Sequence, residues 1–327
     1  MPIWTKLIKS CAISALLTYL AGDLIQPKDM KRHIWALRCA AAALILTFFP
    51  VGGVCQDRNQ ESVNREIFAH TLEVASGAED ASMGELTVRI AESFMGTPYV
   101  AGTLEVEPEA LQICMDKTDC ILFVEMCTCL ALTYKGIDLT AAAVDTEEAP
   151  SYELFCRNVQ AMRYRRGIVD GYASRLHYTS EWIIQAEKLG IMEEFSAEIG
   201  QEYEQTFSFM SGHPDSYAQM KDVQVRYAIA AVEKELESHA PFYYVPQDRL
   251  REEAVAARIH DGDLIFFKSK VKGLDITHVA IARRAEGQLH FIHASSKAGK
   301  VILEPRTLAD YAANGIRVAR LKCQRSL

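Results

Sequence analysis

The stretch "TDCILFVE" (residues 118–125) places a cysteine between a short polar start and an apolar run. Asp119 is a residue type that caps helix N-termini and Gly136 is one that ends helices, so we expect a helix from residue 120 to about residue 135. Cys120 would lie in its first turn. Free N–H groups and the helix dipole favour an anion there, which would lower the pKa of the thiol and stabilise a developing oxyanion.

A buried structural role is the common one for cysteine, and we expect it for Cys127, Cys129 and Cys156. A nucleophilic cysteine also needs a base and a group that orients this base. Whether Cys120 is a nucleophile therefore depends on what the rest of the chain supplies.

Two histidines in the C-terminal part of the chain are candidates for these roles. In "THVAIA" (residues 277–282), His278 shares a strand face with Ala280 and Ala282, which leave room for a helix to approach closely. In "HFIHASS" (residues 290–296), His293 would lie on the next strand of a hairpin, within reach of His278, and could fix the tautomer of its imidazole. The side chain of His290, three residues before His293, would face the opposite side of that strand. The alternative for each is an ordinary core or surface histidine.

The order of hydrophobic periodicities predicts an α+β fold. Residues 56–80 indicate a helical lead-in, and Ser82 with Glu85 indicates the capping box of a second helix. Residues 137–257 mix helical patterns with aromatic and basic loops. Five short strands are then expected: "LIFFKS", "THVAIARR", "LHFIHASS", "VILEP" and "IRVARL". Helices followed by an antiparallel sheet are typical of the α+β class.

Residues 30–56 have the layout of a secretory signal peptide. Basic residues precede an apolar run over residues 39–49, which is too short for a comfortable membrane span. We expect residues 1–55 to be an upstream segment and signal peptide, translation to begin at Met30, and the mature protein to be exported and periplasmic, with no integral membrane domain. Lipid attachment at Cys55 is the alternative, but Val54 before it fits that reaction poorly.

The charge of the chain argues against nucleic-acid binding. Residues 1–55 contain six of the 35 basic and two of the 43 acidic residues, so the remainder has 29 and 41 and a formal charge of −12. A nucleic-acid partner requires a basic footprint. Cys127 and Cys129 diverge by roughly 200° on a helix, and His290 and His293 face opposite sides of a strand, so we expect no metal site and no cofactor.

Five segments in order resemble the NlpC-type cell-wall cysteine peptidases and amidases, which are circularly permuted relatives of papain. The segments are "GTPYVAG", "TDCILFVE", "DGDLIFF", "THVAIA" and "FIHASS". The resemblance covers residues 82–132 and 259–321. It implies a papain-like α+β core with N-terminal helices, in which the catalytic cysteine lies at a helix N-terminus packed on an antiparallel sheet.

The resemblance also implies roles for individual residues. Cys120 would be the nucleophile, His278 the general base and acid, and His293 the orienting third residue. Tyr99 and Asp119 would lie beside the active site and contribute to substrate binding, with the Tyr99 hydroxyl contacting the substrate or the oxyanion. Residues 56–327 would form a single NlpC-like catalytic domain, with an insertion at about residues 137–257.

The chain departs from the family pattern at three positions near the motifs. Ile121 and Leu122 follow the cysteine where Ser-Gly is usual, and Asp261 replaces a proline before Gly-Asp-Leu. These departures and the insertion point to a substrate different from that of the common family members.

Residues 161–183 of the insertion concentrate arginine and aromatic residues. Tyrosine and tryptophan can stack on sugar faces, while arginine binds carboxylates through two hydrogen bonds. The candidate substrate-binding residues are Tyr164, Ser174, Arg175, His177, Tyr178 and Trp182. The alternative is a solvated basic surface.

The elongated form is similar to a subfamily of N-acetylmuramoyl-L-alanine amidases. This similarity implies cleavage of peptidoglycan fragments (muropeptides, including anhydro forms) between the muramic lactyl group and L-Ala. We expect the protein to be a monomer. Three alternatives stay open: an endopeptidase cutting between γ-D-Glu and a diamino acid, a non-catalytic glycan-binding module, and an acyltransferase on the same scaffold.

Overall fold

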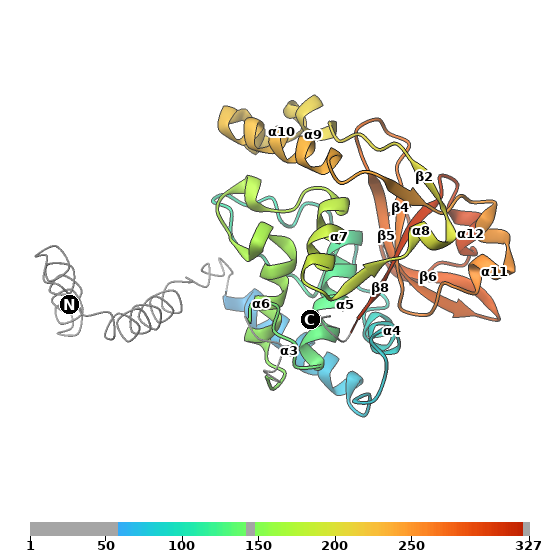
Figure 1. The fold of residues 1–327 in the computed structure, drawn as a ribbon. Coiled ribbons are helices and arrows are strands. Elements are labelled where there is room, and N and C mark those ends of the chain that lie inside the picture. Colours follow the sequence, from blue (N-terminus) through green and yellow to red (C-terminus); the bar gives the residue numbers. More distant parts are fainter. Residues whose placement is uncertain (1–57, 142–147, 323–327) are drawn as a thin grey trace, which may run out of the picture. The chain divides into compact units, whose positions relative to one another are not determined.

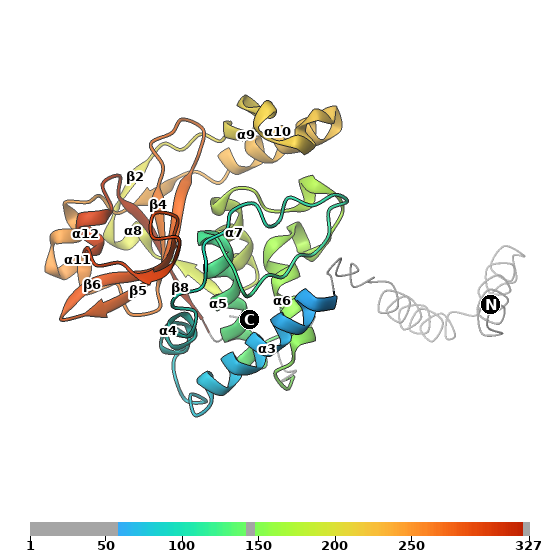
Figure 2. The same ribbon diagram turned by 180° about the vertical axis from the view of Figure 1, so that it is seen from behind.

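A six-stranded antiparallel sheet with helices on both of its faces forms the centre of the protein (Figures 1 and 2). The computed structural model describes residues 58–141 and 148–322. The expected signal peptide, including Cys55, therefore lies outside the described residues. No helix within the described ranges is long and apolar enough to cross a membrane.

The strand order in the sheet is β1-β8-β4-β5-β6-β7. Five of the strands are those that the period-two pattern predicts. They are β4 (Leu264–Lys268), β5 (Ile276–Ala285), β6 (Gln288–Ser295), β7 (Lys300–Leu303) and β8 (Ile316–Leu321). The sixth, β1 (Met192–Glu194), comes from the expected insertion and pairs with β8. Its three residues are too few to show alternation.

The helices between residues 58 and 188 form the helical layer on one face of this sheet. Its helices are α3 (Arg58–Ala75), α4 (Met83–Ser93), α5 (Cys120–Tyr134), α6 (Tyr152–Arg163) and α7 (Thr179–Lys188). The expected capping box is present: the Ser82 hydroxyl accepts a hydrogen bond from the Glu85 N–H, and the Glu85 carboxylate accepts one from the Ser82 N–H. The predicted lead-in, second helix and cysteine helix are thus confirmed.

Helix α5 is buried on all sides because its sequence has almost no polar face. It packs in one hydrophobic cluster with Val279 and Ile281 of β5. Ala280 and Ala282 belong to the cluster on the other face, beneath the short helices α11 (Glu253–Ala256) and α12 (Leu308–Tyr311). The prediction that Ala280 and Ala282 leave room for this helix was therefore wrong, because the larger side chains of Val279 and Ile281 face α5.

Two glycines bring α4 against the turn that leads into β4. A Cβ atom on Gly262 would lie 2.2 Å from the Gly84 carbonyl oxygen, and Gly262 has φ +85°. Only a residue without a side chain fits this close approach. The Asp-Gly-Asp segment before β4 therefore serves to join the helical layer to the sheet.

The segment 137–257 is ordered secondary structure in its described part. Beyond α6, α7 and β1, it adds α8 (Ser196–Ile199), α9 (Phe209–Gly212), α10 (Val223–Glu237) and a two-stranded sheet of β2 (Gln201–Tyr203) and β3 (Phe242–Tyr244). Residues 161–183 contain the end of α6, two short 3₁₀ turns and the first half of α7.

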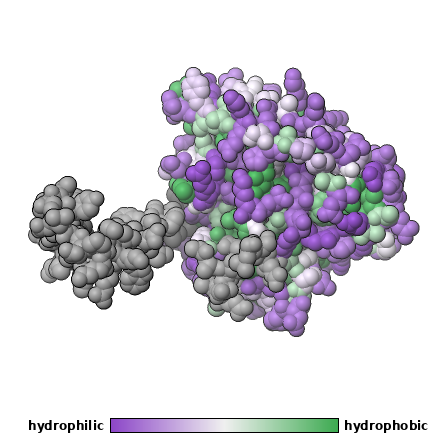
Figure 3. Space-filling view, viewed as in Figure 1, coloured by the Kyte–Doolittle hydropathy of each residue, from purple (hydrophilic) through white to green (hydrophobic). Residues whose placement is uncertain are grey.

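The surface and the cysteines fit a protein with one well-formed interior. Hydrophilic side chains cover most of the face shown in Figure 3, with smaller hydrophobic patches between them. Cys127, Cys129 and Cys156 are buried, as expected for structural cysteines. They are free thiols, as are Cys114 and Cys120, while Cys323 lies outside the described residues.

Candidate active site

Cys120 is the first residue of α5, as the sequence predicts. The Asp119 carboxylate accepts a hydrogen bond of 3.0 Å from the Leu122 N–H and caps the helix. The Cys120 thiol is partly exposed, and the backbone N–H of Val279 is within hydrogen-bonding reach of its sulfur. The sulfur is therefore next to β5, one residue from His278.

Tyr99 is held beside this helix start by backbone pairing on two sides. The Thr118 N–H donates to the Pro98 carbonyl (3.0 Å), and the Tyr99 N–H donates to the Gly299 carbonyl (2.9 Å). Burial raises the pKa of the Tyr99 hydroxyl, and the nearby Cys120 and Asp119 raise it further. The hydroxyl is thus neutral and able to donate a hydrogen bond beside the thiol.

His278 and His293 are in direct contact across the β5–β6 hairpin. The distance from Nε2 of His278 to Nδ1 of His293 is 2.6 Å, and the ring centroids lie 4.8 Å apart at 83°. The His278 ring packs against Phe267, and the His293 ring packs against Phe291. This contact agrees with the hairpin arrangement that the sequence predicts.

The β4–β5 ladder shifts register beside His278. Phe267 pairs with His278, but the next residue, Lys268, pairs with Ile276. Such a bulge bends a strand and turns its side chains locally. His278 thus lies at the irregular end of β5.

The charges in this site differ from those expected of a cysteine at a helix start. Burial, followed by the charge of Asp119, raises the pKa of the Cys120 thiol to about 11, although N–H groups of Val279, Ile121 and Cys120 itself act in the opposite direction. The predicted lowering is therefore not found, because burial outweighs the helix terminus.

Both imidazoles are also neutral at neutral pH. Burial, then the neighbouring His293, lowers the pKa of His278 to about 3. Burial lowers the pKa of His293 to about 4, opposed by Glu304. The resting site therefore holds a thiol and two uncharged rings rather than a thiolate and an imidazolium.

Three residues near the histidines were not predicted: Glu304, Arg306 and Tyr311. Oε2 of Glu304 lies 3.3 Å from Nε2 of His293. The Tyr311 ring centroid lies 6.2 Å from that of His278 and 5.9 Å from that of His293. Glu304, the carboxylate in "VILEP", could have been predicted, because strand alternation places its side chain on the same face of the sheet as His293. Tyr311 lies in a single helical turn, which has no sequence signal.

The aromatic candidates in residues 161–183 are interior residues. Tyr164, Tyr178 and Trp182 are 1–3% exposed. The Tyr164 hydroxyl donates to Glu109 and the Tyr178 hydroxyl donates to Glu233. In this structure none of the three offers a free ring face to a sugar. The predicted stacking on a sugar is therefore not found, and these rings stabilise the insertion instead.

Ser174, Arg175 and His177 are occupied by local contacts as well. Arg175, 4% exposed, donates to the Leu104 carbonyl and to Glu105. The Ser174 hydroxyl donates to the Gly171 carbonyl, and the His177 ring is stacked 4.4 Å from the ring of Tyr172. Within residues 58–141 and 148–322, none of the six candidates forms a hydrogen bond or ion pair with Cys120, His278 or His293.

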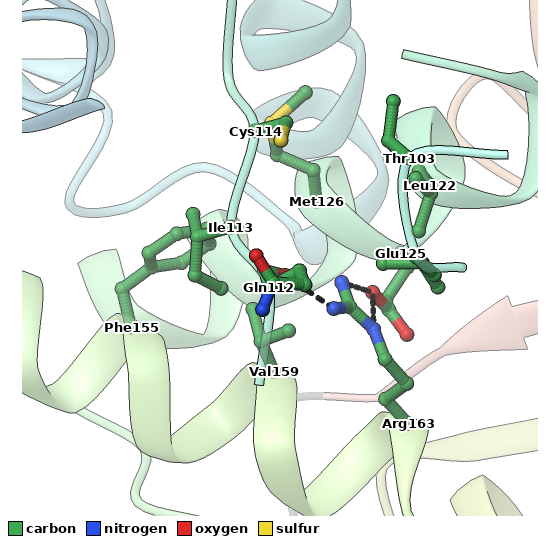
Figure 4. Close-up of a pocket in the computed structure, with 11 residues that line it drawn as sticks. Thr103, Gln112, Ile113, Cys114, Leu122, Glu125, Met126, Phe155, Val159 and Arg163 are labelled. Atoms are coloured by element: carbon green, nitrogen blue, oxygen red, sulfur yellow. Dashed lines mark hydrogen bonds and ion pairs between the residues drawn. The ribbon is translucent and has the colours of Figure 1, made fainter. Parts of the chain in front are cut away.

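A small pocket lies beside the first turns of α5 and contains a buried ion pair (Figure 4). Arg163 donates to Glu125 from Nε (3.0 Å) and Nη2 (2.5 Å), and from Nη1 to the Gln112 carbonyl. These bonds tie α6 and the loop before Cys120 to α5. In the described part of the chain, no three His, Cys, Asp or Glu side chains converge as metal ligands.

The fold and these residues define an α+β protein with a cysteine at a helix start beside a pair of histidines. A model of the AmiA-like family, described as N-acetylmuramoyl-L-alanine amidase-like, matches residues 89–316. The chain belongs to this family. None of the curated proteins matches it.

Several solved structures are similar to this chain. An N-acetylmuramoyl-L-alanine amidase from Bacteroides uniformis is 31% identical (TM-score 0.66) and is matched over 73% of this chain and 99% of that chain. A Bacteroides fragilis protein provisionally named a xylanase is 38% identical (TM-score 0.61) over 70% of this chain and 98% of its own. A Legionella pneumophila protein, 20% identical (TM-score 0.56) over 80% and 96%, shares the fold alone.

Proposed function

We propose that this protein is a cysteine amidase of the NlpC type, with a papain-like core, that hydrolyses the amide between the muramic lactyl group and L-Ala of muropeptides. The observation that carries the proposal is the 2.6 Å contact between His278 and His293 on the strands beside the Cys120 helix start. Family membership and the amidase from Bacteroides uniformis support the choice of bond.

In the proposed mechanism the proton moves as the nucleophile attacks. His278 takes the proton of the Cys120 thiol, and the sulfur attacks the lactyl carbonyl carbon. The Cys120 N–H and the Tyr99 hydroxyl stabilise the oxyanion. His278 then protonates the leaving L-Ala amine, and water hydrolyses the thioester. Because thiol and imidazole are both neutral at rest, the proton leaves Cys120 only as the sulfur attacks.

The residue types of the site favour an amide over a glycosidic bond. Glycoside hydrolysis generally requires two carboxylates on opposite sides of the bond. Here the carboxylate beside the histidines, Glu304, is engaged by Arg306 at 2.7 Å. We therefore propose that the provisional xylanase name of the Bacteroides fragilis relative does not describe this chain.

We further propose that the protein acts outside the cytoplasm, in the periplasm. The basic and apolar pattern of residues 30–56 supports export, and muropeptides arise where peptidoglycan is remodelled. Fractionation of cells that express the gene with a C-terminal tag tests this: a mature form that begins near residue 56 is expected in the periplasmic fraction. Full-length protein retained in the cytoplasm contradicts it.

The test of the activity is digestion of defined muropeptides, with product masses measured. We expect a stem peptide with a free L-Ala amine, no product from Cys120→Ser, and unchanged turnover in the matched control Cys114→Ser. Full activity in Cys120→Ser, or inhibition by a chelator, contradicts the mechanism. Cleavage after D-Glu would identify the endopeptidase instead, and binding without any turnover would identify the glycan-binding module.

A further inference from the structure

We propose that Glu304 is a positioning residue that sets the tautomers of both histidines and leaves Nδ1 of His278 as the nitrogen that takes the Cys120 proton. The inference rests on the proposed function for its catalytic meaning, but the tautomers themselves are a property of the resting protein. Nothing in the sequence motifs or in the family description assigns this carboxylate a role.

The position of Glu304 is fixed by the sheet and by one arginine. It directly follows β7, and its N–H donates to the Phe291 carbonyl at 2.9 Å, which places it across from the strand that carries His293. Its side chain is 7% exposed. Oε1 accepts a 2.7 Å hydrogen bond from Nε of Arg306. Oε2 lies 3.3 Å from Nε2 of His293, within ion-pair distance but outside hydrogen-bond geometry in this structure.

The carboxylate is ionised in this environment. Burial acts to raise the pKa of Glu304, but the hydrogen bonds from Arg306 and its charge prevail and hold the pKa below its ordinary value. The Arg306 guanidinium in turn lies 4.4 Å above the Tyr311 ring, which packs against both histidines. A fixed negative charge therefore stands behind His293.

The tautomers follow from counting protons. Two ring nitrogens 2.6 Å apart must share one proton, so His278 and His293 cannot both present N–H groups or both present lone pairs. The anionic Glu304 favours the proton of His293 on Nε2. Nδ1 of His293 is then an acceptor, Nε2 of His278 is the donor, and Nδ1 of His278 carries the lone pair.

An amide in place of the carboxylate would allow the reverse order. In Glu304→Gln the NH₂ group can donate to Nε2 of His293, which moves the His293 proton to Nδ1 and the His278 proton to its own Nδ1. The base is then blocked, although the shape of the site is unchanged. We expect kcat to fall roughly 10²- to 10⁴-fold with little change in KM.

The test combines ¹⁵N NMR of the histidine rings with muropeptide kinetics. In the wild-type protein we expect His293 protonated at Nε2 and His278 protonated at Nε2, and in Glu304→Gln we expect both protons on Nδ1. The matched control is Glu193→Gln, which removes a surface carboxylate paired with Lys322 at the sheet edge. It should leave the tautomers and kcat unchanged.

The outcomes separate this inference from the proposed function. A wild-type His278 protonated at Nδ1, or a Glu304→Gln protein with unchanged tautomers, overturns the role of Glu304 whatever the activity. A wild-type protein with the expected tautomers and no muropeptide turnover supports that role and refutes the proposed function. If Glu304→Gln does not fold, the wild-type spectrum alone decides.

Discussion

At the scale of the residue, the unusual feature of the site is the absence of charge on its reacting groups. The Cys120 thiol has its pKa raised to about 11, and His278 has its pKa lowered to about 3, both mainly by burial. A cysteine at a helix terminus is commonly expected to be a thiolate. Under the proposed mechanism the nucleophile is generated during the reaction, when His278 removes the thiol proton.

This state predicts how Cys120 reacts with iodoacetamide. Because the thiolate alone is alkylated, the rate should rise about tenfold per pH unit from pH 6 to pH 9 without a plateau. Peptide mass spectrometry provides the rates, because it separates Cys120 from Cys114, the other partly exposed cysteine among the described residues. A plateau below pH 8 would reveal a thiolate–imidazolium pair and contradict the neutral resting state.

At the scale of the element, local sequence signals decided what the sequence could predict. The five C-terminal strands are apolar runs bounded by turn residues, α5 is bounded by the cap signals of Asp119 and Gly136, and each lies where expected. Strand β1 is three residues long, and its place beside β8 depends on a partner more than a hundred residues away. The face of β5 that receives α5 was also missed, because alternation gives two faces without saying which neighbour covers each.

The same limit applies to the candidate site. The histidine contact was predictable because adjacent strands of a hairpin impose it, whereas Tyr311 reaches the site through tertiary packing alone. Composition was the weaker guide: an arginine- and aromatic-rich segment looked like a sugar site, and the fold uses Tyr178 and Trp182 as interior residues instead. The type of a residue shows which contacts its side chain can make, but it does not show whether the side chain is exposed.

Helix α5 depends on the buried ion pair between Arg163 and Glu125. Arg163→Met leaves the Glu125 carboxylate buried without its partner, so we expect a loss of about 3–5 kcal/mol in the free energy of unfolding. Urea denaturation measures it. The matched control is Arg65→Met, which breaks exposed pairs with Glu61 and Glu153 and should cost less than about 1 kcal/mol. Equal losses in the free energy of unfolding would contradict the stabilising role of the buried ion pair.

At the scale of the whole molecule, buried neutral histidines make stability depend on pH. His177, His278 and His293 have pKa values lowered to about 3, 3 and 4, mainly by burial. The unfolded chain binds these protons below about pH 6.5 and the native protein only near pH 3–4. Their contribution to stability is therefore fully present above pH 6.5 and is lost as the pH falls toward 3.

His177→Gln isolates this effect away from the proposed active site. The variant should be less stable than the wild-type protein at pH 7.5, because it loses the stacking on Tyr172. As the pH falls from 6.5 to 4, the difference in free energy of unfolding should shrink by at most about 1.4 kcal/mol per pH unit. Denaturation curves at several pH values measure it, and a difference that stays constant would show that His177 titrates normally.

The layered arrangement has a consequence for when the protein gains its chemistry. The cysteine helix is made early, while the paired imidazoles arrive only with the β5–β6 hairpin, more than 150 residues later in the chain. During synthesis, the Cys120 thiol is therefore without its base until that hairpin packs against α5. Under the proposed mechanism, completing the fold is itself the activation step, and no propeptide is needed to silence the unfinished enzyme.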